Sequence, residues 1–114
     1  MQYVFLLHED QAAWDALNEA EQAEGVAAHM AFVGALNEAN AFNSGAPLGP
    51  AGQGKLVSAD GIHDGPFADT KEQIGGFYMI EAANLDEAID WAKKCPTAQY
   101  GRVEVREIPD YANG

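Results

Sequence analysis

The alternation of apolar and polar residues predicts a strand at the start of the chain. Residues 2–8 are aromatic and branched, and their apolar side chains point to both sides of that strand. One side carries Tyr3, Phe5 and Leu7, and the other carries Val4 and Leu6. A strand that is apolar on both sides belongs inside a layered fold.

The next region has the spacing of a helix. It begins at a capping residue, Asp10, bends or breaks at Gly25, and ends near Asn40. Its second half places apolar residues and one histidine on a single face, which we expect to be buried. That face carries Val26, His29, Met30, Val33 and Leu36.

The second half of the chain repeats the change from strand to helix. Residues 41–54 have a short strand-like start, and the glycines and prolines that follow predict a loop or an irregular edge. Asn84 with Glu87 predicts a capping box for a second helix. The predicted elements are a strand at 55–60, a long loop at 61–75, a strand at 76–82, a helix at 85–95 and a half-exposed strand at 101–108. The core stripe of the second helix is Leu85, Ala88, Ile89, Ala92 and Cys95.

This order predicts an α+β fold of the ferredoxin-like βαββαβ type, with a four-stranded antiparallel sheet and two helices on one face. Strands 2–8 and 76–82 also carry large apolar groups on the face that no helix covers. Soluble monomers rarely expose such a patch, so we expect a homodimer that packs sheet to sheet. Residues 1–109 form one domain in this interpretation, and 110–114 a C-terminal tail.

Charge narrows the possible partners. Eighteen acidic and six basic residues give the 114-residue chain a formal charge of −12, which argues against nucleic acid and membranes. A small anionic ligand stays possible, because a few local cations can outweigh a distant field. The single cysteine, Cys95, and the absence of a signal-peptide pattern predict a cytoplasmic protein.

The most specific stretch is HDGPFADTKEQIGGFYMIEA, residues 63–82. Through it the chain resembles the YCII-related family, in the DGPF branch named for Asp64-Gly65-Pro66-Phe67. The similarity extends to HMAF (29–32), LDEAIDWAKKCP (85–96) and VEVREI (103–108). The resemblance implies the dimeric α+β barrel fold, in agreement with the predicted topology.

The resemblance also implies two kinds of function. Related proteins include small isomerases and dehydrochlorinases of oxygenated ring-derived acids, in which a histidine on the first helix and an aspartate are suspected of acid–base work. In this chain those residues are His29 and Asp64. Many DGPF proteins are encoded beside extracytoplasmic-function sigma factors, which implies a regulatory role instead.

Each candidate residue has a structural alternative. His29 is either a core histidine with one hydrogen bond or a proton shuttle near neutral pH. Asp64 either closes its own turn or orients His29. Lys71 either pairs with surface acids or holds a ligand carboxylate, and Tyr78 either packs in the core with a partner for its hydroxyl or binds substrate.

The leading hypothesis is a cofactor-independent enzyme with lyase or isomerase chemistry on an oxygenated organic acid. Its pocket lies between the sheet and the first helix, with the 61–75 loop at the mouth. No residues have the spacing of a metal site, and no cofactor is expected. The alternatives are a non-catalytic ligand-binding or regulatory protein that works with a sigma factor, and a dimer whose role is association alone.

Overall fold

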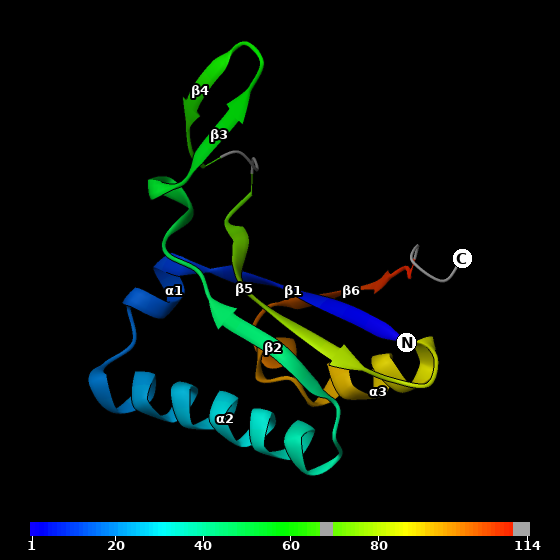
Figure 1. Ribbon diagram of the computed structural model, residues 1–114. Coiled ribbons are helices and arrows are strands. Elements are labelled where there is room, and N and C mark those ends of the chain that lie inside the picture. Colours follow the sequence, from blue (N-terminus) through cyan, green and yellow to red (C-terminus); the bar gives the residue numbers. More distant parts are fainter. Residues whose placement is uncertain (67–69, 111–114) are drawn as a thin grey trace.

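Figure 1 shows a computed structural model of the protein, in which one face of an antiparallel sheet is covered by helices. The structure describes residues 1–66 and 70–110, so Phe67 of the DGPF motif and tail residues 111–114 lie outside the described residues. The sheet has the strand order β2-β5-β1-β6. Its strands are β1 (Gln2–Asp10), β2 (Phe42–Pro47), β5 (Glu72–Glu81) and β6 (Arg102–Ile108). The predicted α+β ferredoxin-like fold is confirmed.

Helices lie on the lower side of the sheet in Figure 1. They are α1 (Gln11–Asp15), α2 (Glu19–Glu38) and α3 (Leu85–Lys94), with short 3₁₀ turns η1 (Ala51–Gln53) and η2 (Pro96–Gln99). The core fills the space between these helices and the sheet. Its largest members are Tyr3, Phe5, Tyr78 and Ile80 from the strands, with Phe32 and Leu36 from α2. The sequence placed Tyr3, Phe5 and Leu7 on one side of the first strand, and the structure shows that this is the side that faces the core.

The prediction that Gly25 breaks the first helix was wrong. The break lies at residues 16–18, where Asn18 caps α2: its Oδ1 accepts from the Glu21 backbone N–H at 2.8 Å. Gly25 sits inside α2 because the Trp14 ring lies on it; a Cβ at position 25 would meet Trp14 at 2.8 Å. The glycine serves close packing rather than helix termination.

The buried face of α2 also differs from the prediction. Leu36 and Phe32 are buried, and His29 is half-buried, whereas Val26 and Met30 are 52% and 69% exposed. On α3, Ala88, Ala92 and Cys95 are buried, but Leu85 is 50% exposed. The exposed apolar residues of α2 face an open cavity, so helical periodicity found the right side of the helix but not its burial.

The strand at 55–60 does not join the four-stranded sheet. Residues Lys55–Ser58 (β3) pair only with Gly61–Asp64 (β4), in a separate two-stranded hairpin. The turn of this hairpin requires Gly61, whose φ of +139° is available to glycine and strained for other residues. The second strand of the sheet is β2, which pairs with β5 at its edge. Its glycine and proline content suggested a loop or an irregular edge, and the structure shows an edge strand with an irregular register between Phe42 and Ser44.

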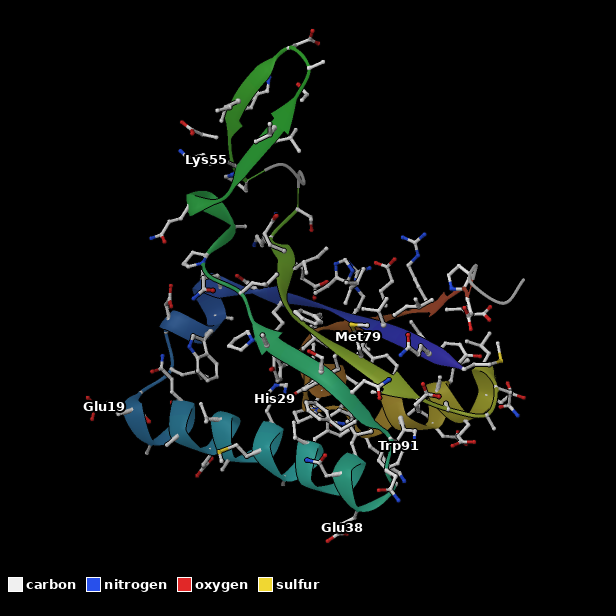
Figure 2. The ribbon with its side chains drawn as sticks, viewed as in Figure 1. Glu19, His29, Glu38, Lys55, Met79 and Trp91 are labelled. Atoms are coloured by element: carbon white, nitrogen blue, oxygen red, sulfur yellow. The ribbon has the colours of Figure 1, made fainter. Side chains whose placement is uncertain are left out.

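The second face of the sheet is not covered by any helix of the described residues (Figure 1). Alternation along the strands places Val4, Leu6, Phe77 and Met79 on this face, and Figure 2 shows Met79 on the side of the sheet opposite His29. This is the face on which the homodimer was predicted, and the homodimer stays a prediction. Within the described part of the chain, no helix is long and apolar enough to cross a membrane.

Candidate functional site

A cavity of about 950 Å³ lies between the sheet and the two N-terminal helices, where the sequence predicted a pocket. Its size is in the range of small-molecule sites. Most of its wall is apolar, contributed by residues such as Trp14, Val26, Met30, Val33 and Phe42. His29, Tyr78 and Tyr100 bring polar atoms to this wall. Such a cavity offers an apolar ligand a few oriented hydrogen-bonding groups.

His29 uses both ring nitrogens inside this site. Nδ1 lies 2.8 Å from the Tyr78 hydroxyl, and Nε2 lies 3.0 Å from the Tyr100 hydroxyl. The three side chains come from α2, β5 and the segment after α3, so only the folded chain brings them together. Figure 2 shows His29 pointing from α2 toward the sheet.

Two further groups extend the hydrogen-bond chain. The Tyr100 hydroxyl donates to Oε1 of Glu9 at 3.2 Å, and the Thr97 hydroxyl donates to the same oxygen at 2.7 Å. Glu9 reaches them because it follows Tyr3, Phe5 and Leu7 on the inward side of β1. Thr97 is fully buried, so its bond to Glu9 fixes the carboxylate position.

The acceptor-only carboxylate sets the direction of every bond in this chain. The single hydroxyl hydrogen of Tyr100 is donated to Glu9 in a hydrogen bond. The Tyr100 oxygen can therefore only accept a hydrogen bond from His29, and the donor is the N–H at Nε2. A neutral imidazole with its proton on Nε2 has a lone pair on Nδ1, and that nitrogen accepts from the Tyr78 hydroxyl. The tautomer of His29 therefore follows from the hydrogen-bond network, and Nδ1 is the basic atom.

Burial keeps His29, Tyr78 and Tyr100 uncharged. It lowers the pKa of His29 below its usual value near 6.5, and the nearby Glu9 charge partly opposes this by raising it. Burial also raises the pKa of Tyr78 and that of Tyr100, so both stay protonated donors at neutral pH. The site thus combines a neutral base at Nδ1 with a phenolic acid beside it.

Gly45 on β2 makes room for the Tyr78 side chain. A Cβ at position 45 would lie 2.6 Å from Tyr78 Cδ1 and 3.0 Å from the Phe77 carbonyl oxygen. Phe32 supports the other side of the Tyr78 ring, with ring centroids 5.2 Å apart in an edge-to-face arrangement. These contacts hold the hydroxyl of Tyr78 against His29.

The structure does not bring the predicted pair of His29 and Asp64 together within one chain. Asp64 ends β4, forms an ion pair with Lys55 at the base of the hairpin, and is 79% exposed. Figure 2 shows Lys55 far from His29. Both ring nitrogens of His29 already have tyrosine partners, so the position predicted for Asp64 is filled by the hydroxyl of Tyr100, which Glu9 orients.

Lys71 lies on the wall of a different, smaller cavity of about 450 Å³. The predicted loop at 61–75 was wrong at both ends, because Gly61–Asp64 form β4 and β5 begins at Glu72. Of its described residues, Thr70 and Lys71 line the second cavity, and Gly75 is the one that also reaches the larger cavity. Tyr78 is in the site, and its predicted need for a hydroxyl partner is met by His29. Its role in substrate binding, like that of Lys71, stays a prediction.

The charges of the larger cavity have one sign. Its described lining includes Glu9, Asp10, Glu21 and Glu24, and neither lysine nor arginine. No group of three or more histidine, cysteine, aspartate or glutamate side chains is arranged to hold a metal ion in residues 1–66 and 70–110. His29, Tyr78 and Tyr100 can supply proton transfer and hydrogen bonding at this wall.

Comparisons with known proteins agree with the fold. A model of the YCII-related domain matches residues 1–112. An uncharacterized protein of Rhizobium meliloti (strain 1021) is 49% identical over 55 residues, which are 46% of this chain and 44% of that protein. The matched segment therefore spans less than half the length of that relative.

A solved structure resembles the whole chain. It is 5-chloro-2-hydroxyhydroquinone dehydrochlorinase (TftG) from Burkholderia phenoliruptrix AC1100, in complex with 2,5-dihydroxybenzoquinone. The TM-score is 0.58 at 17% identity, over 99% of this chain and 98% of that one. At this identity the likeness shows a shared fold.

Proposed function

Because this chain belongs to the YCII-related family, we propose that its larger cavity is the active site of a cofactor-independent acid–base enzyme. The reaction is the removal of a proton next to a carbonyl group, followed by isomerisation or elimination. The observation that carries the proposal is the directed chain from Tyr78 through His29 and Tyr100 to Glu9. The structurally similar dehydrochlorinase supports this class of chemistry.

Each residue of this hydrogen-bond network has a role in the proposed reaction. Nδ1 of His29 takes the proton from substrate carbon, and the bonding electrons move toward the carbonyl oxygen. Tyr78 turns its hydroxyl to that oxygen and stabilises the negative charge that develops there. Tyr100 and Glu9 hold the imidazole and stabilise the imidazolium. The proton then returns to a different atom in isomerisation, or an anionic group leaves in elimination.

The cavity wall favours a neutral ring over the organic acid expected from the resemblance. Four carboxylates line the cavity and no described cation does, so a ligand carboxylate would meet repulsion on entry. The apolar wall suits a flat ring, and the tyrosine hydroxyls suit its oxygens. The substrate class we propose is an uncharged cyclic compound with hydroxyl and carbonyl groups.

Two ring compounds test the substrate class. Hydroquinone and 2,5-dihydroxybenzoate share a ring and differ by a carboxylate. We expect hydroquinone to shift the NMR signals of His29 and Tyr78, and 2,5-dihydroxybenzoate to bind more weakly as salt is lowered. Equal affinity for both compounds at every salt concentration contradicts the proposed preference.

Hydrogen–deuterium exchange tests the proton transfer itself. Wild-type protein in D₂O should speed the loss of the protons next to a carbonyl of cyclohexane-1,2-dione, followed by NMR. His29→Gln should abolish the acceleration while circular dichroism shows an unchanged fold. Catalysed exchange that survives this substitution removes His29 from the mechanism.

The alternative of a regulatory protein has one observation in its favour. Acidic side chains gather on α1 and α2, at Asp15, Glu19, Glu21 and Glu24. Such a surface attracts a basic protein, and a sigma factor is the candidate implied by the resemblance. Salt-sensitive capture of a sigma factor that is unchanged in His29→Gln, without exchange activity in the wild type, would favour this function.

A further inference from the structure

The hairpin of β3 and β4 stands apart from the body of the protein. Figure 1 shows it projecting from the side of the sheet opposite α2. Its base is closed by a hydrogen bond from the Gly65 N–H to the Gly54 carbonyl at 2.9 Å and by the ion pair of Lys55 with Asp64. Its strands pair with each other and with no strand of the main sheet. An isolated two-stranded hairpin has marginal stability in water, so a second surface is needed to hold its shape.

The side chains of the hairpin are those of a contact surface. Leu56, Val57 and Ile62 are 49%, 72% and 70% exposed. Val57 lies directly opposite Ile62 in the strand register, so the two side chains share one face of the hairpin. Protein edges exposed to water usually carry charged residues instead. Apolar branched residues at these positions indicate that something covers the hairpin.

The hairpin rises beside the sheet face that carries no helix. The centre of that face is apolar, with Val4, Leu6, Phe77 and Met79, each half-buried in the single chain. A molecule seated on this face lies next to the hairpin and can contact both surfaces. One occupant therefore explains two exposed apolar regions.

The charge distribution identifies the occupant as a second copy of this chain. Two copies of charge −12 repel each other unless they meet where charges cancel. The uncovered face carries both signs of charge: Arg102 pairs with Glu72 at 2.7 Å, and Glu104 is hydrogen-bonded to His8 at 2.8 Å. Arg106 is on the same face, opposite Val4. A basic partner would be drawn instead to the acidic surface of α1 and α2.

We propose that the β3–β4 hairpin is a dimerisation arm. In a two-fold dimer joined through the uncovered sheet faces, the arm of each copy reaches past the interface and packs Val57 and Ile62 on the other copy. The arm adds apolar contact area outside the sheet and gives the hairpin a cover that residues 1–66 and 70–110 of its own chain do not supply. This inference does not depend on the chemistry of the cavity.

The first test is the mass of the full chain in solution by sedimentation velocity and light scattering. Wild-type protein should be a dimer. Val57→Asp/Ile62→Asp should weaken dimerisation at least about tenfold, because each substitution places a charge in an apolar contact. The control Ala27→Asp/Leu85→Asp adds the same charge at exposed apolar positions outside the arm and should leave the dimer intact.

These measurements also define failure. A wild-type monomer overturns the proposal, and so does an arm variant that dimerises like the wild type. A larger assembly that the arm variant reduces to stable dimers overturns it too, because the arm then joins dimers rather than subunits. Circular dichroism should show that both double variants keep the helix content of the wild type.

Cross-linking tests the contact directly. A photo-reactive benzoylphenylalanine at position 57 is introduced in a ¹⁴N chain, which is denatured together with an excess of wild-type ¹⁵N chain, refolded so that mixed dimers form, and irradiated. Cross-linked peptides should join the light arm to heavy-chain residues around the uncovered face. Cross-links found within light chains only show that the arm contacts its own subunit and overturn the proposal.

Discussion

The hydroxyl of Tyr78 lies 2.8 Å from Nδ1 of His29, and burial keeps both groups uncharged. Burial lowers the pKa of His29 and raises that of Tyr78, so a neutral base faces a neutral acid at physiological pH. When a ligand oxygen accepts the hydrogen bond of the Tyr78 hydroxyl, that hydroxyl no longer occupies the lone pair of Nδ1. The geometry therefore couples binding of an oxygenated ring to activation of the base.

Replacing Tyr78 with phenylalanine removes only the hydroxyl of this pair. We expect the catalysed exchange rate to fall about 100-fold, as for loss of a positioned acid or oxyanion donor. Tyr3→Phe is the matched control, because it removes a hydroxyl from another core tyrosine, whose hydroxyl contacts the Met1 sulfur at 3.9 Å. NMR-monitored exchange compares the two variants, and equal rates would show that the Tyr78 hydroxyl has no part in proton transfer.

The lowered pKa of His29 makes stability depend on pH. The unfolded chain binds a proton near pH 6.5, whereas the folded chain resists protonation until a lower pH. Stability contributed by neutral His29 is thus complete above about pH 6.5 and declines as the pH falls from there to the folded-state pKa. Urea denaturation should show this decline in the wild type and a smaller decline in His29→Gln. Identical pH profiles for the two proteins contradict the burial argument.

The rate of catalysed exchange should also depend on the protonation state of His29. The base acts in its neutral form, so the exchange rate should rise with pH through the folded-state pKa of His29 and level off near neutrality. The NMR titration of the His29 ring protons gives that pKa independently. A rate that titrates elsewhere would assign the base to another group.

The order of the elements could be predicted from the sequence, because strand alternation and helix caps are local signals. Asn84 capped α3 as expected, with its side chain accepting from the Glu87 N–H. The same alternation that places Tyr3, Phe5 and Leu7 inward continues to Glu9. That parity is the signal in the sequence that points to Glu9.

The partners of His29 could not be found in the same way. Tyr78 and Tyr100 are 49 and 71 residues away along the chain, and only the fold brings them together. Asp64 was chosen because its motif is specific, yet a specific motif does not say where its loop points. The hairpin carries Asp64 away from the cavity, and Lys55 on the facing strand holds it there.

Glu9 should control the pKa of His29 from a distance. Its charge raises that pKa, so Glu9→Gln should lower it further and shift the pH dependence of exchange in the same direction. Glutamine retains an oxygen that accepts from Tyr100, which separates loss of charge from loss of the hydrogen bond. NMR titration of His29 is the measurement. A residue with a purely structural role would leave the titration unmoved.

Two variants are matched controls for this substitution. Glu104→Gln removes a glutamate charge from the opposite face of the sheet, where it contacts His8. Asp64→Asn removes the charge of the residue first expected to orient His29. Both should leave the His29 pKa unchanged, and a shift in Asp64→Asn equal to that in Glu9→Gln would restore the predicted pair.

Gly45 should be irreplaceable because the site depends on its missing side chain. In Gly45→Ala the new Cβ meets the Tyr78 ring at 2.6 Å and the Phe77 carbonyl at 3.0 Å, and the backbone oxygen cannot move out of its strand. We expect a loss of about 1–3 kcal/mol in the free energy of unfolding, as for overpacked cores. The displaced Tyr78 ring should also weaken hydroquinone binding.

Gly34→Ala is the control, since nothing lies within 4 Å of its Cβ and α2 should gain up to about 1 kcal/mol from better helix propensity. Urea denaturation ranks the three proteins; a Gly45→Ala variant as stable as the wild type, with unchanged binding, would show that Tyr78 can move without cost and that β2 does not hold its hydroxyl against His29.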